Sequence, residues 1–352
     1  MVTMRDVAQA AGVSQAAVSY AYNRPGKLSE AQRDRIFQVA EELGYIGPHA
    51  TGRSLRTGLV GALGLMITDS LPYAFDDPAT AALLKGISEV GELSEVALTL
   101  LPCPLESDRM AQGSGVLLRG LVDGFLAYAM PEGHPAVETV LRRRLPVVII
   151  DGPNPGGLPR VGIRDREAAR EAASHVLSLG HRSVGILVDR LLPDGHSGLV
   201  TPARRRQARD LVMKERLAGY AAAFRSAGIP WSSATIVEAG GFHEAASLAA
   251  AESLLGGEPV TAVLAATDVL ALATIGAARR RGLRIPQDLS VIGFDDLPVA
   301  AAANLSTVRQ PLVEKGRQAA RLLLGVIGGE EPREIVLPTE LVVRATTAPP
   351  GG

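Results

Sequence analysis

Residues 3–48 read TMRDVAQAAGVSQAAVSYAYNRPGKLSEAQRDRIFQVAEELGYIGP, and the capping residues in this stretch predict three short helices. Thr3 is followed three residues later by Asp6, which is the spacing of a capping box at the start of a helix. Gly12 is placed to end that first helix, because glycine adopts the left-handed conformation without strain. Ser14 follows at once and can cap a second helix, so the two helices are joined by a tight turn.

The third helix of this stretch is marked at both of its ends. Ser29 with Gln32 forms another capping box, and Gly44 stops the helix. The apolar residues between these signals recur at helical spacing, which favours one buried face. Three helices in about 45 residues form a small bundle. Its core is expected to contain Val7, Val18, Ala21 and Ile36.

From residue 59 the pattern changes to an alternation of strands and helices. Short apolar runs predict buried strands at residues 59–67, 96–101, 124–129, 147–151, 184–188, 261–266 and 289–294. Longer segments between them predict helices, among them residues 79–93, 166–179, 268–281 and 312–327. Such alternation is typical of parallel sheets with helices on both faces. The length fits two doubly wound subdomains, and residues 191–209 are expected to be an irregular insertion.

Composition narrows the class of protein. The chain has 352 residues and a net charge of -1, which excludes a broadly basic protein. Residues 1–58 nevertheless hold seven Lys or Arg against five Asp or Glu. Cys103 is the one cysteine of the sequence, so no intramolecular disulfide can form. We expect no metal or cofactor site, no membrane span and a cytoplasmic protein, because the sequence has neither ligand clusters nor a long apolar run.

The sequence resembles the LacI (lactose-repressor) family of transcription regulators over essentially its whole length. In the N-terminal region the matching motifs are Asp6-Val7-Ala8, Ala11-Gly12-Val13-Ser14, Ala17-Val18-Ser19, Asn23, Leu28-Ser29, Arg33, Ile36 and Leu43-Gly44-Tyr45. Further along they are Arg53-Ser54-Leu55-Arg56-Thr57-Gly58, Thr267-Asp268, Gly293-Phe294-Asp295-Asp296, Thr307-Val308-Arg309-Gln310-Pro311 and Glu340-Leu341-Val342-Val343-Arg344. The resemblance implies an α/β protein with a small all-α helix-turn-helix headpiece and a periplasmic-binding-protein-like sensor. We place the headpiece at residues 1–46, a hinge at 47–58, and the two-lobed effector-binding and dimerisation domain at 59–347.

The resemblance assigns DNA contacts to the headpiece and the hinge. The residues concerned are Thr3, Ser14, Gln15, Ala16, Ser19, Tyr20, Asn23, Arg53 and Leu55. A second helix with short polar side chains on its outer face fits the major groove, and Gln15 can pair with adenine through two hydrogen bonds. Tyr20 departs from the family, which commonly has arginine there, so guanine readout at that step is in doubt. Leu55 is expected to wedge into the minor groove, the alternative being a plain flexible linker with Leu55 docked on the sensor domain.

The resemblance also places an effector site at the ends of the sensor strands, where doubly wound sheets bind ligands. Its residues are Tyr73, Phe75, Asp151, Arg216, Thr267, Asp268 and Asp295. Three of them have a plainer interpretation, because Asp268 fits a helix cap, Arg216 a surface charge and Phe75 a core residue. Thr267 stands where the family often has asparagine, so one hydrogen-bonding pair is in doubt.

These observations together predict a homodimeric regulator that binds a near-palindromic operator and responds to a small molecule. Two acids with one arginine leave an excess of hydrogen-bond acceptors, which suits a polyol such as a sugar. A purine or another metabolite is the alternative effector. A solute-binding protein is the alternative class, and the first 58 residues argue against it. We expect no enzyme activity, because no nucleophile motif and no phosphate-binding loop occurs in the sequence.

Overall fold

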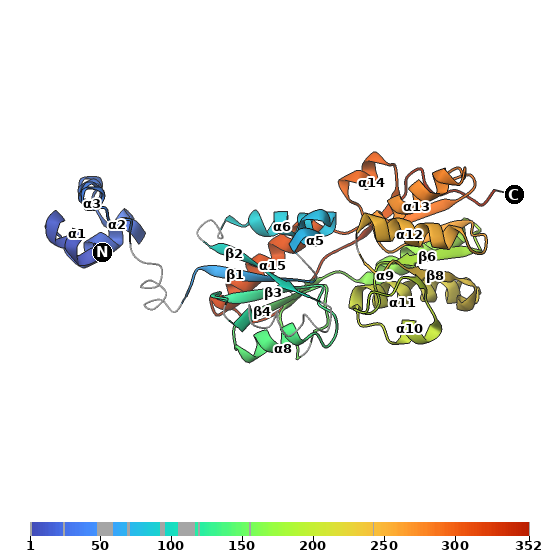
Figure 1. The fold of residues 1–352 in the computed structure, drawn as a ribbon, viewed down its shortest axis with the longest axis horizontal. Coiled ribbons are helices and arrows are strands. Elements are labelled where there is room, and N and C mark those ends of the chain that lie inside the picture. Colours follow the sequence, from blue (N-terminus) through green and yellow to red (C-terminus); the bar gives the residue numbers. More distant parts are fainter. Residues whose placement is uncertain are drawn as a thin grey trace. The chain divides into compact units, whose positions relative to one another are not determined.

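The structure is a computed structural model, and it divides into two compact units, Met1–Gly61 and Ala62–Gly352. It describes residues 2–23, 25–47, 59–68, 71–91, 96–104, 117, 118, 120–154, 156–241 and 243–351 (Figure 1). The expected hinge residues Arg53 and Leu55 lie outside the described residues, as do the side chains of Asn23 and Tyr73.

The first unit is a three-helix bundle. It contains α1 (Met4–Ala11), α2 (Gln15–Asn23), the short 3-10 helix η1 (Pro25–Lys27) and α3 (Glu30–Glu42). The expected core is confirmed, because Val7, Val18, Ala21 and Ile36 are all buried in one cluster. Tyr45, just beyond α3, closes this core and meets the ring of Tyr22 edge-on, with 5.9 Å between ring centroids. The bundle therefore has a core of its own.

The second unit contains two lobes, each built on a sheet. The first lobe holds a six-stranded sheet in the order β12-β5-β4-β3-β1-β2. Its strands are β1 (Ala62–Thr68), β2 (Ala97–Cys103), β3 (Gly124–Tyr128), β4 (Val147–Ile150), β5 (Arg160–Gly162) and β12 (Glu334–Val336), and all neighbours pair parallel. Its helices are α5 (Leu71–Asp76), α6 (Pro78–Ser88), α8 (Pro135–Arg142) and α15 (Leu312–Ile327). In Figure 1, α5 and α6 lie on one side of this sheet and α8 on the other.

The second lobe holds a seven-stranded sheet in the order β13-β11-β10-β9-β6-β8-β7. Its strands are β6 (Val184–Val188), β7 (Gly198–Leu199), β8 (Thr235–Glu238), β9 (Ala262–Ala265), β10 (Ser290–Asp295), β11 (Ser306–Arg309) and β13 (Glu340–Val342). Its helices are α9 (Asp165–Ser178), α10 (Pro202–Arg206), α11 (Leu211–Ser226), η3 (Trp231–Ser233), α12 (Glu244–Leu255), α13 (Asp268–Arg280) and α14 (Pro298–Ala302). The central strands run parallel, and antiparallel pairing occurs only where β7 and β13 join at the edges.

The sequence missed the shorter strands. The seven expected strands coincide with β1, β2, β3, β4, β6, β9 and β10, whereas β5, β7, β8, β11, β12 and β13 were not expected. These six have two to four residues each and, unlike the four-residue strands β4 and β9, most of them include a charged residue that interrupts the apolar run. The expectation that residues 191–209 are irregular was wrong in part, because they contain β7 and α10. Arg204 orders this insertion through Asp194 at 2.8 Å and the buried Glu238 at 2.5 Å.

The two lobes are connected by more than one chain crossing. Along its described part, the chain passes from the first lobe to the second lobe between β5 and α9. It returns between β11 and α15 and crosses again between β12 and β13. Asp165, Gln310 and Leu337 therefore lie at the junction of the lobes. No helix among the described residues is long and apolar enough to cross a membrane.

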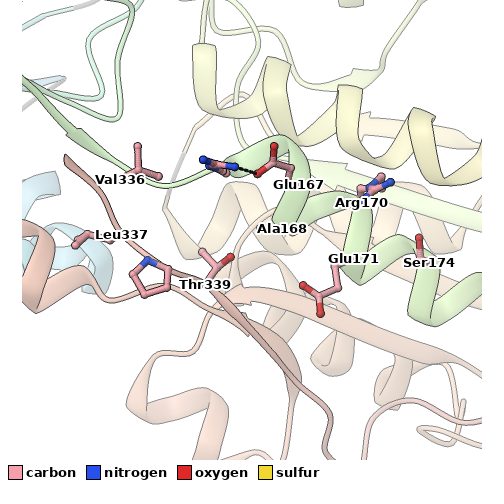
Figure 2. Close-up of a pocket in the computed structure, with 10 residues that line it drawn as sticks. Glu167, Ala168, Arg170, Glu171, Ser174, Val336, Leu337 and Thr339 are labelled. Carbon is pink, nitrogen blue, oxygen red and sulfur yellow. Dashed lines mark hydrogen bonds and ion pairs between the residues drawn. The ribbon is translucent and has the colours of Figure 1, made fainter. Parts of the chain in front are cut away.

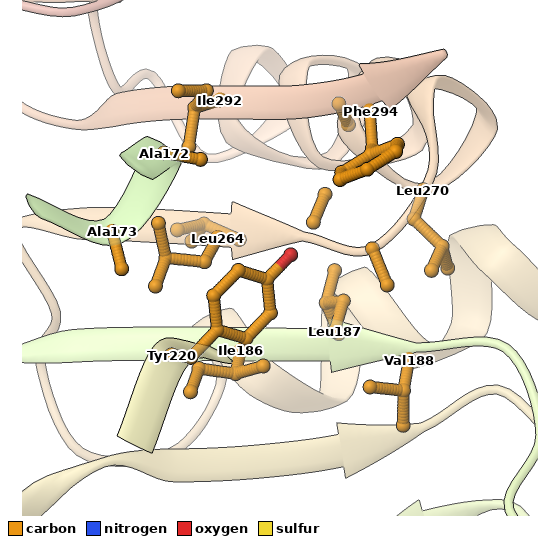
Figure 3. Packing of buried hydrophobic residues seen from close by; sticks show 14 of the residues in the cluster. Ala172, Ala173, Ile186, Leu187, Val188, Tyr220, Leu264, Leu270, Ile292 and Phe294 are labelled. Atoms are coloured by element: carbon orange, nitrogen blue, oxygen red, sulfur yellow. The ribbon is translucent and has the colours of Figure 1, made fainter. Parts of the chain in front are cut away.

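The core of the second lobe fixes the position of α11 against α9. Tyr220 of α11 and Phe294 of β10 are fully buried among aliphatic side chains of β6 and β9 (Figure 3). A Cβ atom added at Gly219 would overlap the backbone carbonyl of Arg166, so α11 can approach α9 this closely only with glycine there. This close approach brings Arg216, one turn earlier on α11, beside Asp165 at the start of α9.

Candidate functional site

The turn between α1 and α2 is fixed by hydrogen bonds at the end of α1 and at the start of α2. Gly12 has a φ of 68° and ends α1, and the N–H of Val13 bonds back to the carbonyl of Ala8. The Ser14 hydroxyl then accepts from the N–H of Ala17 and caps α2. Thr3 caps α1 in the expected capping box, with its N–H and hydroxyl both donating to Asp6. Thr3 and Ser14 thus fix the two helix starts.

Gln15, Ala16 and Tyr20 lie exposed on one side of α2, and Tyr20 is 39% exposed. Ser19 was expected on the same face, but only 8% of it is exposed. Ser19 directly follows Val18, which faces the core. The side of α2 that Ser19 occupies is therefore buried in the bundle. The face available to a partner is therefore narrower than the sequence suggested.

A cleft lies between the two lobes of the second unit. It is lined by Ile67, Thr68, Asp77, Ala79, Thr80, Tyr128, Ala129, Asp151, Asp189, Arg190, Asp210, Val212, Met213, Arg216, Thr267, Val269, Asp295 and Gln310. Among these described residues, five are carboxylic acids and two are arginines. The cavity has a volume of about 80 Å³, whereas ligand pockets usually have about 300–1,000 Å³. The cavity between the lobes is thus smaller in this structure than a usual ligand pocket.

Arg216 connects the elements that meet at the cleft. Its side chain is 4% exposed, which contradicts its interpretation as a surface charge. Its Nε donates to Asp165 at 2.9 Å, and one terminal nitrogen donates to the carbonyl of Ala266. The same nitrogen lies 4.0 Å from Asp295, and the guanidinium carbon lies 3.5 Å from the centroid of the Phe294 ring. The guanidinium is thus held in one orientation from several sides.

A chain of polar side chains runs from the first lobe to the second. The fully buried Lys315 donates to Asp151 at 2.5 Å and to the side-chain oxygen of Gln310 at 2.6 Å. The amide nitrogen of Gln310 donates to Asp295 at 2.5 Å. Burial raises the pKa of Asp295 to about 6 against the opposing effect of Arg216. Lys315 was not expected from the sequence, because a lysine on a helix is usually exposed.

Asp189, Arg190 and Asp210 are further cleft residues that the sequence analysis missed. Asp189 directly follows β6, and Arg190 comes next in the chain. Asp210 caps α11 by accepting from the N–H of Met213, and it lies 3.9 Å from Arg190. The apolar run of β6 ends in Asp-Arg, and that change from apolar to charged at a strand end was the available signal.

Two of the expected effector residues lie away from the cleft lining. Phe75 is 65% exposed, so it is neither a core residue nor part of the lining. Asp268 is fully buried and accepts from the N–H of Leu297 at 2.8 Å and from the Thr307 hydroxyl at 2.6 Å. These bonds tie α13 to β11 and to the start of α14. Thr267 does line the cleft, where it caps α13 through the N–H of Leu270.

A larger groove of about 670 Å³ runs between α9 and residues 336–339 (Figure 2). Its charged residues include Arg164 and Glu167, which pair with each other at 3.5 Å and are 70% and 59% exposed in their side chains. Solvated pairs of this kind are ordinary surface features. We therefore assign the candidate site to the cleft, where buried charges converge. The described residues contain no group of three or more His, Cys, Asp or Glu that could hold a metal.

Comparison with known proteins gives the class of protein. The family model for bacterial regulatory proteins of the lacI family matches residues 3–47, and the model for a periplasmic binding protein-like domain matches residues 173–347. An HTH-type transcriptional regulator of Mycobacterium tuberculosis is 39% identical over 99% of this chain and 97% of its own length.

Solved structures agree with this class over the full chain. The crystal structure of a LacI family regulator from Corynebacterium glutamicum has a TM-score of 0.76 and 32% identity, covering 98% of each chain. The complex of the transcriptional regulator CelR with cellobiose has a TM-score of 0.69 and 26% identity, covering 98% of this chain and 100% of that one. The chain belongs to the LacI family of DNA-binding transcription regulators, and it is not an enzyme.

The contacts of Asp268 predict a structural role for its carboxylate. In Asp268→Ala, the buried N–H of Leu297 and the hydroxyl of Thr307 lose their acceptor. Because each unsatisfied donor costs about 1–3 kcal/mol, the free energy of unfolding should fall by about 2–6 kcal/mol in urea denaturation. Glu252→Ala, which removes an exposed ion pair with Arg280, is the control and should change it by less than about 0.5 kcal/mol. Equal stability of the two variants would show that the Asp268 contacts are unimportant.

Proposed function

We propose that the protein regulates transcription in the cytoplasm as a homodimer that binds a near-palindromic operator. A small neutral polyhydroxylated molecule, in the first place a sugar, controls its affinity for this DNA. In this proposal residues 1–46 are the DNA-binding headpiece, 47–58 the hinge, and 59–347 the effector-binding and dimerisation domain. The observation that carries the effector class is the excess of buried carboxyl groups over arginines in the cleft lining.

The exposed side of α2 supports a groove-reading role for Gln15, Ala16 and Tyr20. The N-terminal residues of a helix in the major groove reach base edges, and Gln15 is the first residue of α2. Its amide matches the donor and acceptor pattern of adenine. Ser14 and Asn23 are proposed to contact phosphates, which position the headpiece without reading sequence. In the proposed hinge, Arg53 contacts the DNA backbone and Leu55 wedges into the minor groove.

A dimer follows from the small size of one headpiece. A single headpiece with three exposed groove-facing side chains offers few base contacts, and two-fold symmetry doubles them. The operator of a two-fold symmetric dimer mirrors that symmetry, so the two half-sites should be inverted copies of each other. The spacing of the half-sites then depends on how the two sensor domains hold the two hinges.

The acidic cleft supports a neutral ligand that is rich in hydrogen-bond donors. Carboxylates accept from hydroxyl groups, and the fixed guanidinium of Arg216 donates to ligand oxygens. Asp151 and Asp295 approach the cavity from opposite lobes, so one ligand can contact both lobes at once. Thr267 adds a hydroxyl beside them, and the relative CelR has been solved as a cellobiose complex. A ligand that bridges the lobes favours one arrangement of them and thereby changes the spacing of the hinges.

The exposed position of Tyr20 predicts that this residue sets base preference more than affinity. Arginine pairs with guanine through two hydrogen bonds, and tyrosine lacks that fork, so Tyr20→Arg should shift the selected half-site toward guanine at one position. Selection from random DNA with the full-length protein measures this preference. Gln38→Ala on α3, an exposed substitution on a different helix, is the matched control and should return the wild-type half-site. Identical half-sites for wild type and Tyr20→Arg would refute the placement of α2.

The position of Asp295 predicts a loss of effector affinity when its charge is removed. A thermal-shift screen of pentoses, hexoses, disaccharides, cyclic polyols and nucleobases identifies compounds that stabilise the wild type by RT ln(1 + [L]/Kd). For a polyol found in this way, Asp295→Asn should raise Kd at least about tenfold, or about 1.4 kcal/mol. Operator affinity without the compound should stay at the wild-type value.

Asp288→Asn is the control for this experiment, because Asp288 pairs with Arg284 outside the cleft lining. It should leave Kd unchanged. Stabilisation by a nucleobase and by none of the polyols would contradict the proposed effector class, and an unchanged Kd in Asp295→Asn would show that the effector binds elsewhere.

A further inference from the structure

Asp189 differs from the other acids of the cleft in its hydrogen bonding. It follows the last residue of β6, it is 1% exposed, and it lines the cavity from the second lobe. Its backbone carbonyl accepts from the N–H of Gly240, so the main chain is held in place independently of the side chain. The carboxyl group is therefore free of any role in closing the strand or capping a helix.

The other acids of the cleft have strong partners. Asp77 accepts from two N–H groups at the start of α6. Asp151 accepts from the ammonium group of Lys315 through Oδ2, although its Oδ1 has no hydrogen-bond partner among the described residues. Asp210 caps α11 and lies near Arg190, and Asp295 accepts from Gln310 with Arg216 at 4.0 Å. Among the residues that the structure describes, the side chain of Asp189 accepts a hydrogen bond only from the hydroxyl of Thr267, at 3.5 Å from Oδ1. Its Oδ2 is buried and has no hydrogen-bond partner among the described residues.

The surroundings of Asp189 make the unpartnered Oδ2 unfavourable. Burial, followed by the charges of Asp295 and Asp77, raises the pKa of Asp189 well above its usual value, and Arg216 opposes the rise. A buried carboxyl group without a hydrogen-bonding partner destabilises the folded state. Within the described part of the chain, no donor lies within hydrogen-bond distance of Oδ2. A ligand that presents a hydroxyl group in the cavity would supply this donor.

We propose that Asp189 contacts the effector through Oδ2 and restricts it to uncharged molecules that present a hydroxyl group at that point. This inference rests on the proposed function, because it requires the effector to bind in the cleft between the lobes. Asp77, Asp189 and Asp295 influence one another electrostatically across the cavity. A phosphate group placed there would meet three carboxyl groups, so a sugar phosphate should be rejected in favour of the parent sugar.

Asp189→Asn tests this role with two measurements, one of which needs no ligand. The change keeps the shape of the side chain and replaces the carboxyl group with an amide that cannot ionise. In the free protein it should raise the melting temperature by about 2 °C, because an unpartnered carboxyl group is removed. Asp165→Asn is the matched comparison, since Asp165 is also buried but pairs with Arg216 at 2.9 Å, and it should melt below wild type. A melting temperature of Asp189→Asn as low as that of Asp165→Asn would show that Asp189 is a structural residue.

The second measurement uses ribose, cellobiose, hexoses and cyclic polyols, together with the phosphate esters of ribose and the hexoses. For each neutral compound that stabilises the wild type, Asp189→Asn should raise Kd at least tenfold, and the phosphate ester should bind wild type at least tenfold more weakly. An unchanged Kd in the variant, or tighter binding of the ester, overturns the role of Asp189 and leaves the proposed function standing. If no compound of the panel stabilises the wild type, the proposed effector class fails, and the melting temperatures of the free proteins decide whether Asp189 is structural.

Discussion

The buried guanidinium of Arg216 is the contact on which the cleft depends. It joins α11 to Asp165 at the first crossing between the lobes, to the end of β9 through Ala266, and to the end of β10 through Asp295. Breaking a buried pair by removing one partner costs about 3–5 kcal/mol, because the other charge stays buried. Gly219 and Tyr220 on the same helix allow α11 to lie close enough for this network to form. The cleft is thus preformed on the side of the second lobe.

The first lobe meets this preformed face through Gln310 and Lys315, which lie at the second crossing, and through Asp151 after β4. A ligand between the lobes changes their arrangement only by the difference in its affinity for the two arrangements. In the proposed function, that difference in affinity controls DNA binding because the arrangement of the lobes sets the spacing of the hinges that carry the headpieces. A coupling free energy of about 1–3 kcal/mol is typical of such control. In the proposed function, charge inside the cleft therefore determines which molecules can control the DNA-binding unit.

The sequence predicted the headpiece well because local signals dominate there. The caps at Thr3, Ser14 and Ser29 act within three residues, and the helical spacing of the apolar residues predicted the core. The cleft was predicted less completely, because the direction in which a side chain at a strand end points depends on tertiary contacts. Asp189 follows the end of β6, and Asp268 begins α13 shortly after the end of β9. Asp189 lines the cavity, whereas Asp268 accepts hydrogen bonds from Leu297 and Thr307 in distant segments. Lys315 was missed for the same reason, since only its buried partners distinguish it from a surface lysine.

The central claim is that the cleft and the headpieces are thermodynamically coupled. The most direct test measures the Kd of a stabilising polyol for the full-length protein with and without a saturating selected operator, alongside operator Kd with and without the polyol. Linkage requires that the two ratios have the same value, and we expect both to lie at about 5–150-fold in the same direction. A polyol that binds the cleft with equal affinity in the presence and absence of operator would contradict the account.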